Sequence, residues 1–465
     1  MACLRLRSAA IAIALQLFLG GCASMIPAYQ RPAAPVAAAY PGVPAAQDSS
    51  AAASDIEWQD FFSDARLQRL IGAALHNNRD LRVAMLNIEQ ARAQLQLRRA
   101  DELPTVGIGA SGSRQPSGSG SIASVYSAGL AVTAYELDFF GRVRSLSAAA
   151  LAQYLATEEA RKNVQIALVS AVANTYLNLL ADDALLALTR RTLVTREDSL
   201  KLTKLKFEVG AASELDYRQA ESLREGARAT LAQLMRQRAL DENALVLLLG
   251  QALPADLPQG AEIGDQMLIG ELPAGMPSEV LARRPDVRQA EQQLIAANAN
   301  IGAARAAFFP KISLTGSAGT ASSQLSGLFR SGSAAWSFMP QLLLPIFDSG
   351  RNQATLDVAN VNRDIALAQY EKAIQAAFRE VADALAGRAT LGEQLRAQEA
   401  QAHAEAQRYK LADLRYRNGA ASYLDVLDAQ RALFAAQQAL VQVQAQQVQN
   451  KVSLYKVLGG GWKTP

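Results

Sequence analysis

Leu424, Asp428 and Arg431 have the side-chain types and the spacing to act together near the end of the chain. They are four and then three residues apart, so a helix would present all three on one face. A carboxylate there can pair with the guanidinium, and a carboxylate that lines a pore favours cations. An exposed Asp–Arg pair on a solvated helix is the simpler alternative. Asp428 lies too far along the helix that begins near Tyr423 to serve as its cap.

Catalytic chemistry is not indicated elsewhere in the chain. No nucleophile–base pair and no phosphate-binding glycine loop is visible, so we expect no enzyme activity and no cofactor. The only histidines, His76 and His403, lie far apart on helical patterns, and there is no cysteine cluster, so no metal site is expected. The formal net charge is +3 without a dense Lys/Arg block, which argues against a nucleic-acid partner.

The segment before Asp428 belongs to an internal repeat of the sequence. Residues 209–216 and 418–425 are nearly the same, and their glycines are 209 positions apart. Further matches extend the repeat over nearly the whole chain: Gly141-Arg142 with Gly350-Arg351 and Gly250 with Gly459 at the same offset, and Asp80 with Asp286 and Pro104 with Pro310 at an offset of 206. A repeat of this length predicts two copies of one elaborate fold rather than a solenoid.

The repeated motif itself predicts a turn between two helices. Each glycine follows a long helical run, where glycine readily takes the left-handed conformation that ends a helix. A serine then stands three residues before an aspartate, which resembles a capping box with Asp in place of Glu. Small residues around each glycine would allow another protein to approach closely. The residues concerned are Val209, Gly210, Ala211, Ser213 and Asp216 in the first copy, and Asn418, Gly419, Ala420, Ser422 and Asp425 in the second.

The two copies differ at Asp428 and Arg431. Asp428 corresponds to Gln219, and Arg431 corresponds to Ser222. A role in stability alone should occur in both copies, so the difference favours a specific function for the second.

The N-terminus is predicted to be a targeting segment. Arg5 and Arg7 precede a short apolar run that ends Leu19-Gly-Gly-Cys22, too short to remain as a membrane helix. This pattern resembles the bacterial lipobox, which implies a lipoprotein signal peptide over 1–21 and acylation of Cys22. Ala23 resembles the default sorting to the outer membrane, and an ordinary signal peptide that contains a cysteine is the alternative. Residues 22–57 are rich in Ala, Pro and Ser and predict a tether or an extended wrap.

Each copy then predicts helix, β-hairpin, long helix, turn and shorter helix, because the apolar period changes from helical to two and back. The predicted ranges are 58–250 for repeat 1 (hairpin about 104–139, long helix 141–208, turn 209–213, helix 214–249), 251–277 for a linker, 278–458 for repeat 2 (hairpin about 310–347, long helix 350–417, turn 418–422, helix 423–458) and 459–465 for a tail.

These elements restrict the architecture. A helix of this length spans roughly 100 Å, so two shorter helices can cover it only by stacking end to end. Four strands with an apolar face and open edges cannot stand alone in lipid. A membrane barrel begins at eight strands, so a dimer would suffice and a trimer would give twelve.

Taken with Pro277-Ser-Glu-Val-Leu-Ala-Arg-Arg-Pro-Asp286, these features resemble the outer-membrane efflux lipoproteins of the TolC/OprM type, NodT branch. The resemblance covers essentially the whole mature chain. It implies a mainly α fold with membrane β: a homotrimer whose twelve-stranded barrel in outer-membrane lipid continues as a duplicated long-helix tunnel in the periplasm. It also implies a periplasmic adaptor, which docks at the two repeated turns, and an inner-membrane pump, usually of the RND class.

The same resemblance implies that rings of Leu424 and Asp428, with Arg431 nearby, narrow the tunnel at its periplasmic tip. The expected function is then a passive exit duct for drugs or other small toxic compounds. A tunnel for type I protein secretion and a structural envelope lipoprotein without a pore are the alternatives.

Overall fold

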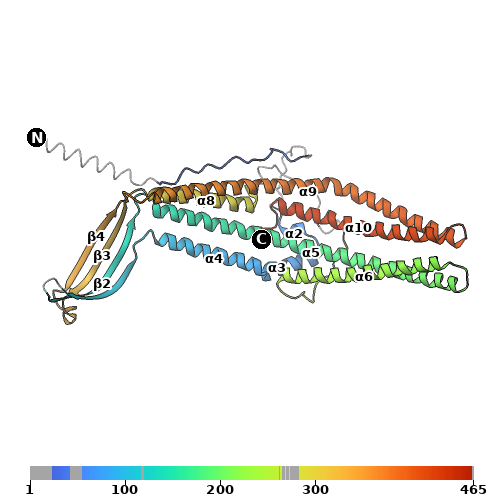
Figure 1. Ribbon diagram of the computed structural model, residues 1–465, viewed down its shortest axis with the longest axis horizontal. Helices are drawn as coiled ribbons and strands as arrows, with labels where there is room; N and C mark the ends of the chain where they lie inside the picture. The colour runs from blue at the N-terminus through green and yellow to red at the C-terminus, as the bar shows by residue number, and fades with distance from the viewer. Residues whose placement is uncertain are drawn as a thin grey trace. The chain divides into compact units, whose positions relative to one another are not determined.

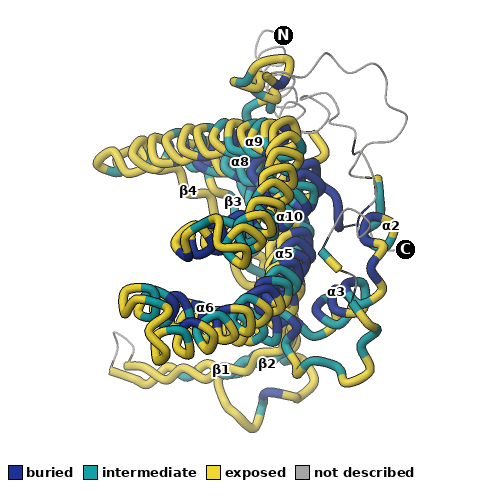
Figure 2. The backbone as a smooth tube through the Cα atoms, turned by 90° about the vertical axis from the view of Figure 1, so that its right-hand side faces the viewer, coloured by how far each residue is buried: buried dark blue, intermediate teal, exposed yellow. Residues whose placement is uncertain are grey.

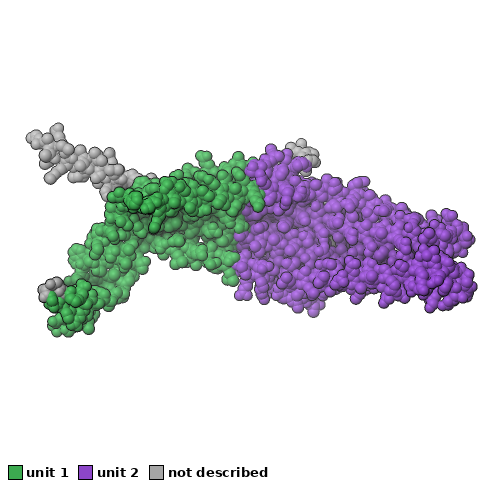
Figure 3. All heavy atoms as spheres, viewed as in Figure 1, with its two compact units in different colours: residues 1–34, 86–159, 288–372 green, residues 35–85, 160–287, 373–465 purple. Residues whose placement is uncertain are grey.

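The computed structural model describes residues 24–41, 55–116, 120–260, 262–263, 268, 272 and 282–462. The predicted signal peptide and Cys22 lie outside the described residues, as does much of the predicted linker. Long helices alternate with two pairs of strands along the chain (Figure 1). The chain divides into two compact units, coloured separately in Figure 3, which are described one at a time.

The first unit contains one antiparallel sheet in the order β1-β2-β3-β4. Its strands are β1 (Val106–Pro116), β2 (Ile122–Leu137), β3 (Lys311–Ser322) and β4 (Ala334–Leu343). Each hairpin of the duplication supplies two neighbouring strands, and β2 pairs with β3 to join the copies. β1 and β4 are therefore the edge strands of this sheet.

The two faces of the sheet differ in polarity. Ile108, Leu130, Ala318 and Trp336 follow one another across the four strands on one face, and Ile108 and Trp336 are 89% and 80% exposed. On the other face serines meet in pairs, with 2.8 Å between the Oγ atoms of Ser111 and Ser127 and 2.7 Å for Ser317 and Ser337. One apolar face is thus left without a cover in this chain.

The β2–β3 seam departs from the predicted alternation at one point. A bulge between Val132 and Tyr135 leaves Ala134 at a φ of 53°. The extra residue shifts the parity of the strand, so Tyr135, not Ala134, continues opposite Leu314. On the other side of Val132 the pairing is regular, and three residues from it, where Gly129 pairs with Gly319, the two backbones lie very close. A Cβ added at Gly319 would stand 2.2 Å from the carbonyl oxygen of Ala128.

Parts of four helices complete this unit: α4 (Arg79–Ala100), α5 (Arg142–Glu208), α8 (Pro285–Ala306) and α9 (Arg351–Arg417). Ile301 and Ala304 of α8 pack against Ala359 of α9. The N-terminal segment is fixed to α8, because Arg31 pairs with the buried carboxylate of Glu291 and the Pro27 carbonyl accepts a hydrogen bond of 2.8 Å from Asn298.

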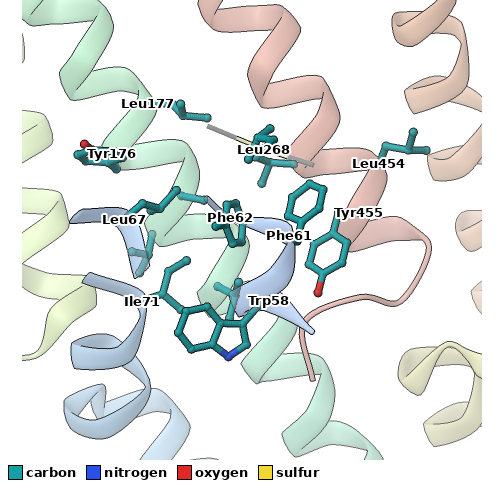
Figure 4. Close-up of a cluster of buried hydrophobic side chains, with 14 of the residues drawn as sticks. Trp58, Phe61, Phe62, Leu67, Ile71, Tyr176, Leu177, Leu268, Leu454 and Tyr455 are labelled. Carbon is teal, nitrogen blue, oxygen red and sulfur yellow. The ribbon is translucent and has the colours of Figure 1, made fainter. Parts of the chain in front are cut away.

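The main hydrophobic core lies in the second unit, around the short helices α2 (Trp58–Phe61) and α3 (Ala65–Asn77). The rings of Phe61 and Tyr455 stack 4.0 Å apart at their centroids, and Phe62 packs edge-on against Phe61 (Figure 4). The α5 side chains Leu177 and Tyr176 belong to the same core. α5 is the one helix of the described chain apolar and long enough to cross a membrane, but 56% of its apolar window is buried inside the protein.

In the second unit, the shorter helices of each copy of the repeat meet end to end. The Asn78 amide caps α4 by accepting from the Leu81 N–H at 2.9 Å, and it donates to the Leu248 carbonyl at the end of α6 (Glu214–Leu249) at 2.9 Å. Arg284, at the start of α8, donates to the Val457 carbonyl at the end of α10 (Tyr423–Val457) at 3.1 Å. These two contacts stand at equivalent positions, since Asn78 corresponds to Arg284 and Leu248 to Val457 in the offsets of the repeat.

Candidate functional site

The repeated turns close helices with their own backbone. Gly210 and Gly419 have φ values of +75° and +72°, and a Cβ at either would meet no atom within 4 Å. The N–H of Ala211 reaches the Lys206 carbonyl at 2.7 Å, and that of Ala420 reaches the Arg415 carbonyl at 2.9 Å. This 6→1 bond, next to a left-handed glycine, is the Schellman ending of a helix. Glycine is required here by φ rather than by crowding.

A capping box starts the next helix in each copy. The Ser213 hydroxyl accepts from the Asp216 N–H at 3.1 Å, and the Asp216 carboxylate accepts from the Ser213 N–H at 3.2 Å. The corresponding distances for Ser422 and Asp425 are 3.3 and 3.1 Å. Each serine hydroxyl therefore satisfies an N–H of the first helical turn, and each aspartate satisfies the N–H of the N-cap serine. Figure 2 shows that many residues of α6 and α10 are exposed.

The two helix pairs of the second unit pack against each other near these turns. Leu223 of α6 joins Tyr423 and Leu427 of α10 in a small buried cluster. The Lys206 ammonium of α5 donates to the Tyr416 hydroxyl of α9 at 3.0 Å and lies 4.6 Å from the centre of that ring. The turns of the two copies are thus held by one apolar cluster and one cation–aromatic contact.

Leu424, Asp428 and Arg431 all lie on the exposed side of α10, as their spacing predicts. Asp428, however, pairs with Arg408 of the neighbouring helix α9 and not with Arg431. Within the described part of the chain Arg431 forms no ion pair. Within this chain the partner of Asp428 is therefore Arg408, because the packing of α9 beside α10 brings a second arginine within reach of the carboxylate, and the role of Arg431 at the gate stays a prediction. The residues that correspond to Arg408 and Asp428 in the first copy are Ser199 and Gln219, so neither charge of this pair is repeated.

The leucine at position 424 is present in both copies of the repeat. Leu215 corresponds to Leu424, and the two are 66% and 54% exposed. The two copies therefore differ in the charged pair of Arg408 and Asp428. Their leucines are equivalent in exposure as well as in position.

A carboxyl pair joins α5 and α6 further along the second unit. Burial raises the pKa of Asp182 to about 7, with a further contribution from its hydrogen bond to Asp241 and from that residue's charge. Asp182 is buried, whereas nearby Arg238 is tied to the exposed Asp183 at 2.7 Å. Because the pKa of the buried Asp182 carboxyl is raised to about 7, the contact between α5 and α6 should be sensitive to pH.

Comparison with known proteins identifies the family of this arrangement. The sequence profile of the outer membrane efflux protein family matches residues 70–251 and 276–460, one match for each copy of the repeat. This chain belongs to the outer membrane efflux protein family. It is accordingly an outer-membrane protein, and the family explains both halves of the duplication together.

Curated relatives support this over nearly their full length. The chain is 52% identical over 454 residues to the probable efflux pump outer membrane protein TtgC of Pseudomonas putida, covering 96% of this chain and 93% of the relative. It is 49% identical over 465 residues to the outer membrane protein OprJ of Pseudomonas aeruginosa, covering 97% and 95%.

Solved structures show the same fold. The open state of the MtrE outer membrane channel of Neisseria gonorrhoeae matches with a TM-score of 0.87 at 43% identity, over 95% of this chain and 99% of that one. The outer-membrane channel OprN matches with a TM-score of 0.80 at 30% identity, over 94% of this chain and 99% of that one. A mainly helical chain with four strands is therefore shared by these outer membrane efflux proteins.

Proposed function

We propose that this protein forms the outer-membrane exit duct of a tripartite efflux pump, and that it carries drugs or other small toxic compounds from the pump to the exterior. The observation that carries the proposal is the four-stranded sheet with an exposed apolar face and two edge strands. The names of the relatives support it, because TtgC and a 51% identical relative, SrpC, are described as parts of efflux and solvent efflux pumps.

The sheet calls for partners of its own kind. In lipid, each unpaired backbone group at the edges of β1 and β4 would cost roughly several kcal/mol. Both edge strands must therefore pair with further strands. Three copies related by a threefold axis supply twelve strands, and closed symmetry is the usual form of a soluble or membrane homo-oligomer. A homotrimer with Trp336 and Ile108 toward lipid satisfies both the edges and the apolar face. A structural lipoprotein without a pore has no use for such a face.

The gate is proposed at the turns of the second unit. Three copies of Leu424 and Asp428 would face one another and narrow the tunnel, with Arg408 holding each carboxylate in place. A periplasmic adaptor would dock on the small residues beside Gly210 and Gly419, and the pump, of the RND class, would supply the driving force. Opening then requires the second helix pair to move away from α5, which separates Lys206 from Tyr416.

Planar-bilayer conductance of the purified full-length protein tests the gate. We expect the double variant Leu424→Ala with Asp428→Ala to raise single-channel conductance several-fold, because both narrowing side chains are removed. The matched control is Leu215→Ala with Gln219→Ala, which makes the equivalent change in the first copy and should leave conductance near that of the wild type. Equal conductance of all three proteins would contradict a gate at Asp428.

The wider proposal is tested in cells. Deletion of the gene should increase susceptibility to organic solvents and antibiotics, and the protein should run as a trimer after cross-linking in outer-membrane fractions. Loss of protein secretion without any change in susceptibility would instead support a tunnel for type I secretion.

A further inference from the structure

A groove between α5, α9 and α10 of the second unit takes no part in the proposed gate. Its volume is about 280 Å³, and its lining includes Arg191 and Arg196 of α5, Tyr409 of α9, and Gln430 and Phe434 of α10. The groove therefore joins a helix of the first copy to two helices of the second.

Arg196 is a buried cation for which the described residues supply no counter-ion. It is 6% exposed, it donates to the Leu223 carbonyl through Nη1 at 2.9 Å, and its guanidinium lies 5.0 Å from the centre of the Phe434 ring. Its Nε is buried and has no hydrogen-bond partner among the described residues. Burial lowers the pKa of Arg196, and the charge of Arg431 lowers it further. A buried charge in this state is costly unless something compensates it.

Gln430 has an unused polar atom in the same groove. It is 8% exposed, and its Nε2 donates to the Tyr409 hydroxyl at 3.2 Å, while its Oε1 is buried and has no partner in the part of the chain that the structure describes. Rotation of the amide by half a turn lets Tyr409 donate to Oε1 and frees Nε2 as a donor. Two buried donors, one from α5 and one from α10, then lie in the walls of the groove.

We propose that this groove binds a small oxyanion, either phosphate itself or the phosphate group of a small ester, between Arg196 Nε and the Gln430 amide. A water molecule could make the same hydrogen bonds but would leave the charge of Arg196 uncompensated, whereas an oxyanion satisfies both. The volume lies at or below the lower end of drug-sized pockets, roughly 300 Å³, so it suits a phosphate-sized group and not a large amphiphile. This site is independent of the proposed transport function.

Calorimetry on the full-length protein in detergent at low ionic strength tests the site, with inorganic phosphate and glycerol 3-phosphate as the probes. We expect saturable binding of at least one of them. Tighter binding of free phosphate would identify the anion itself as the ligand, and tighter binding of glycerol 3-phosphate would identify an ester. No saturable binding of either probe would overturn the proposal and leave water as the occupant.

Three variants separate the site from general electrostatics. Arg196→Lys keeps the charge but lacks Nε, and Gln430→Met removes the amide at similar volume. Each should weaken binding about tenfold or more, since a hydrogen bond to a charged group is worth at least that factor. Gln449→Met is the control, because Gln449 lies on the same helix but bonds to Asn178 outside the groove. Wild-type affinity in a folded Gln430→Met protein would overturn the assignment even if Arg196→Lys failed to fold.

Discussion

Two adjacent arginines of the Leu-Ala-Arg-Arg-Pro-Asp stretch should differ sharply in their effect on stability. Arg284 is buried and pairs with Asp286 at 2.6 Å and with Glu380 at 2.7 Å, and it also donates to the Val457 carbonyl. Arg283 is half exposed and pairs with Asp55 at 3.2 Å. We therefore compare Arg284→Met with Arg283→Met, which remove the same groups from neighbouring positions.

The expected magnitude follows from the partners that each change leaves behind. Breaking a fully buried pair costs about 3–5 kcal/mol, but Asp286 and Glu380 are partly exposed and can be rehydrated, so about 2–3 kcal/mol remains for Arg284→Met. Loss of the exposed Arg283 pair should cost about 0.2–1 kcal/mol. At roughly 2 °C per kcal/mol for a unit of this size, the melting temperature should fall about 5 °C for Arg284→Met and less than about 2 °C for Arg283→Met.

Thermal unfolding of the detergent-solubilised protein, followed by far-ultraviolet circular dichroism, measures both shifts. Arg284→Lys serves as an intermediate, because it keeps the charge but loses the forked geometry that reaches a carboxylate and a carbonyl together. The reasoning is refuted if the two methionine variants melt at the same temperature, since burial and the carbonyl contact would then contribute nothing.

Three further predictions concern other sites. The folded pKa of Asp182, about 7, lies above its ordinary value of 3.8. The wild type should therefore lose stability as the pH rises from 3.8 to about 7, by at most about 4 kcal/mol before solvent screening. Chemical denaturation measures this loss, and the variant Asp182→Asn should not show it. Gly319→Val should abolish the folded protein in outer-membrane fractions because its Cβ meets backbone, whereas Gly107→Val, in open space, should be tolerated. Gly419→Ala should speed hydrogen exchange at the turn by costing about 1–2 kcal/mol, and the helical control Gly226→Ala should not.

Sequence reasoning located the elements well because their boundaries depend on local chemistry. The long helix was expected over 350–417 and lies at Arg351–Arg417, and the shorter helix was expected over 214–249 and lies at Glu214–Leu249. Glycine after a helix and serine before one act within a few residues, so a single sequence contains the whole signal. The alternation in the strands likewise predicted which side chains share a face, as far as the bulge at Ala134.

Contacts between distant segments could not be predicted in the same way. Arg408 is 20 residues from Asp428 and reaches it only because α9 and α10 pack side by side, whereas spacing along one helix points to the nearer Arg431. The bulge at Ala134 has no glycine or proline to mark it. The role of Arg284 was also missed, although the repeat held a usable signal: its counterpart Asn78 meets the same helix end in the first copy.

The closed turns at Gly210 and Gly419 have a mechanical consequence. Each turn satisfies its own backbone through a Schellman bond and a capping box, so its shape needs no support from a neighbouring molecule. A force applied at either turn would be transmitted to the helices and would not be absorbed by local unfolding of the turn. Strain would accumulate instead where side chains alone join the two helix pairs, as they do between Lys206 and Tyr416 and between Arg196 and Phe434. Each helix pair therefore behaves as a lever with a rigid end, joined to the other pair by a few side-chain contacts.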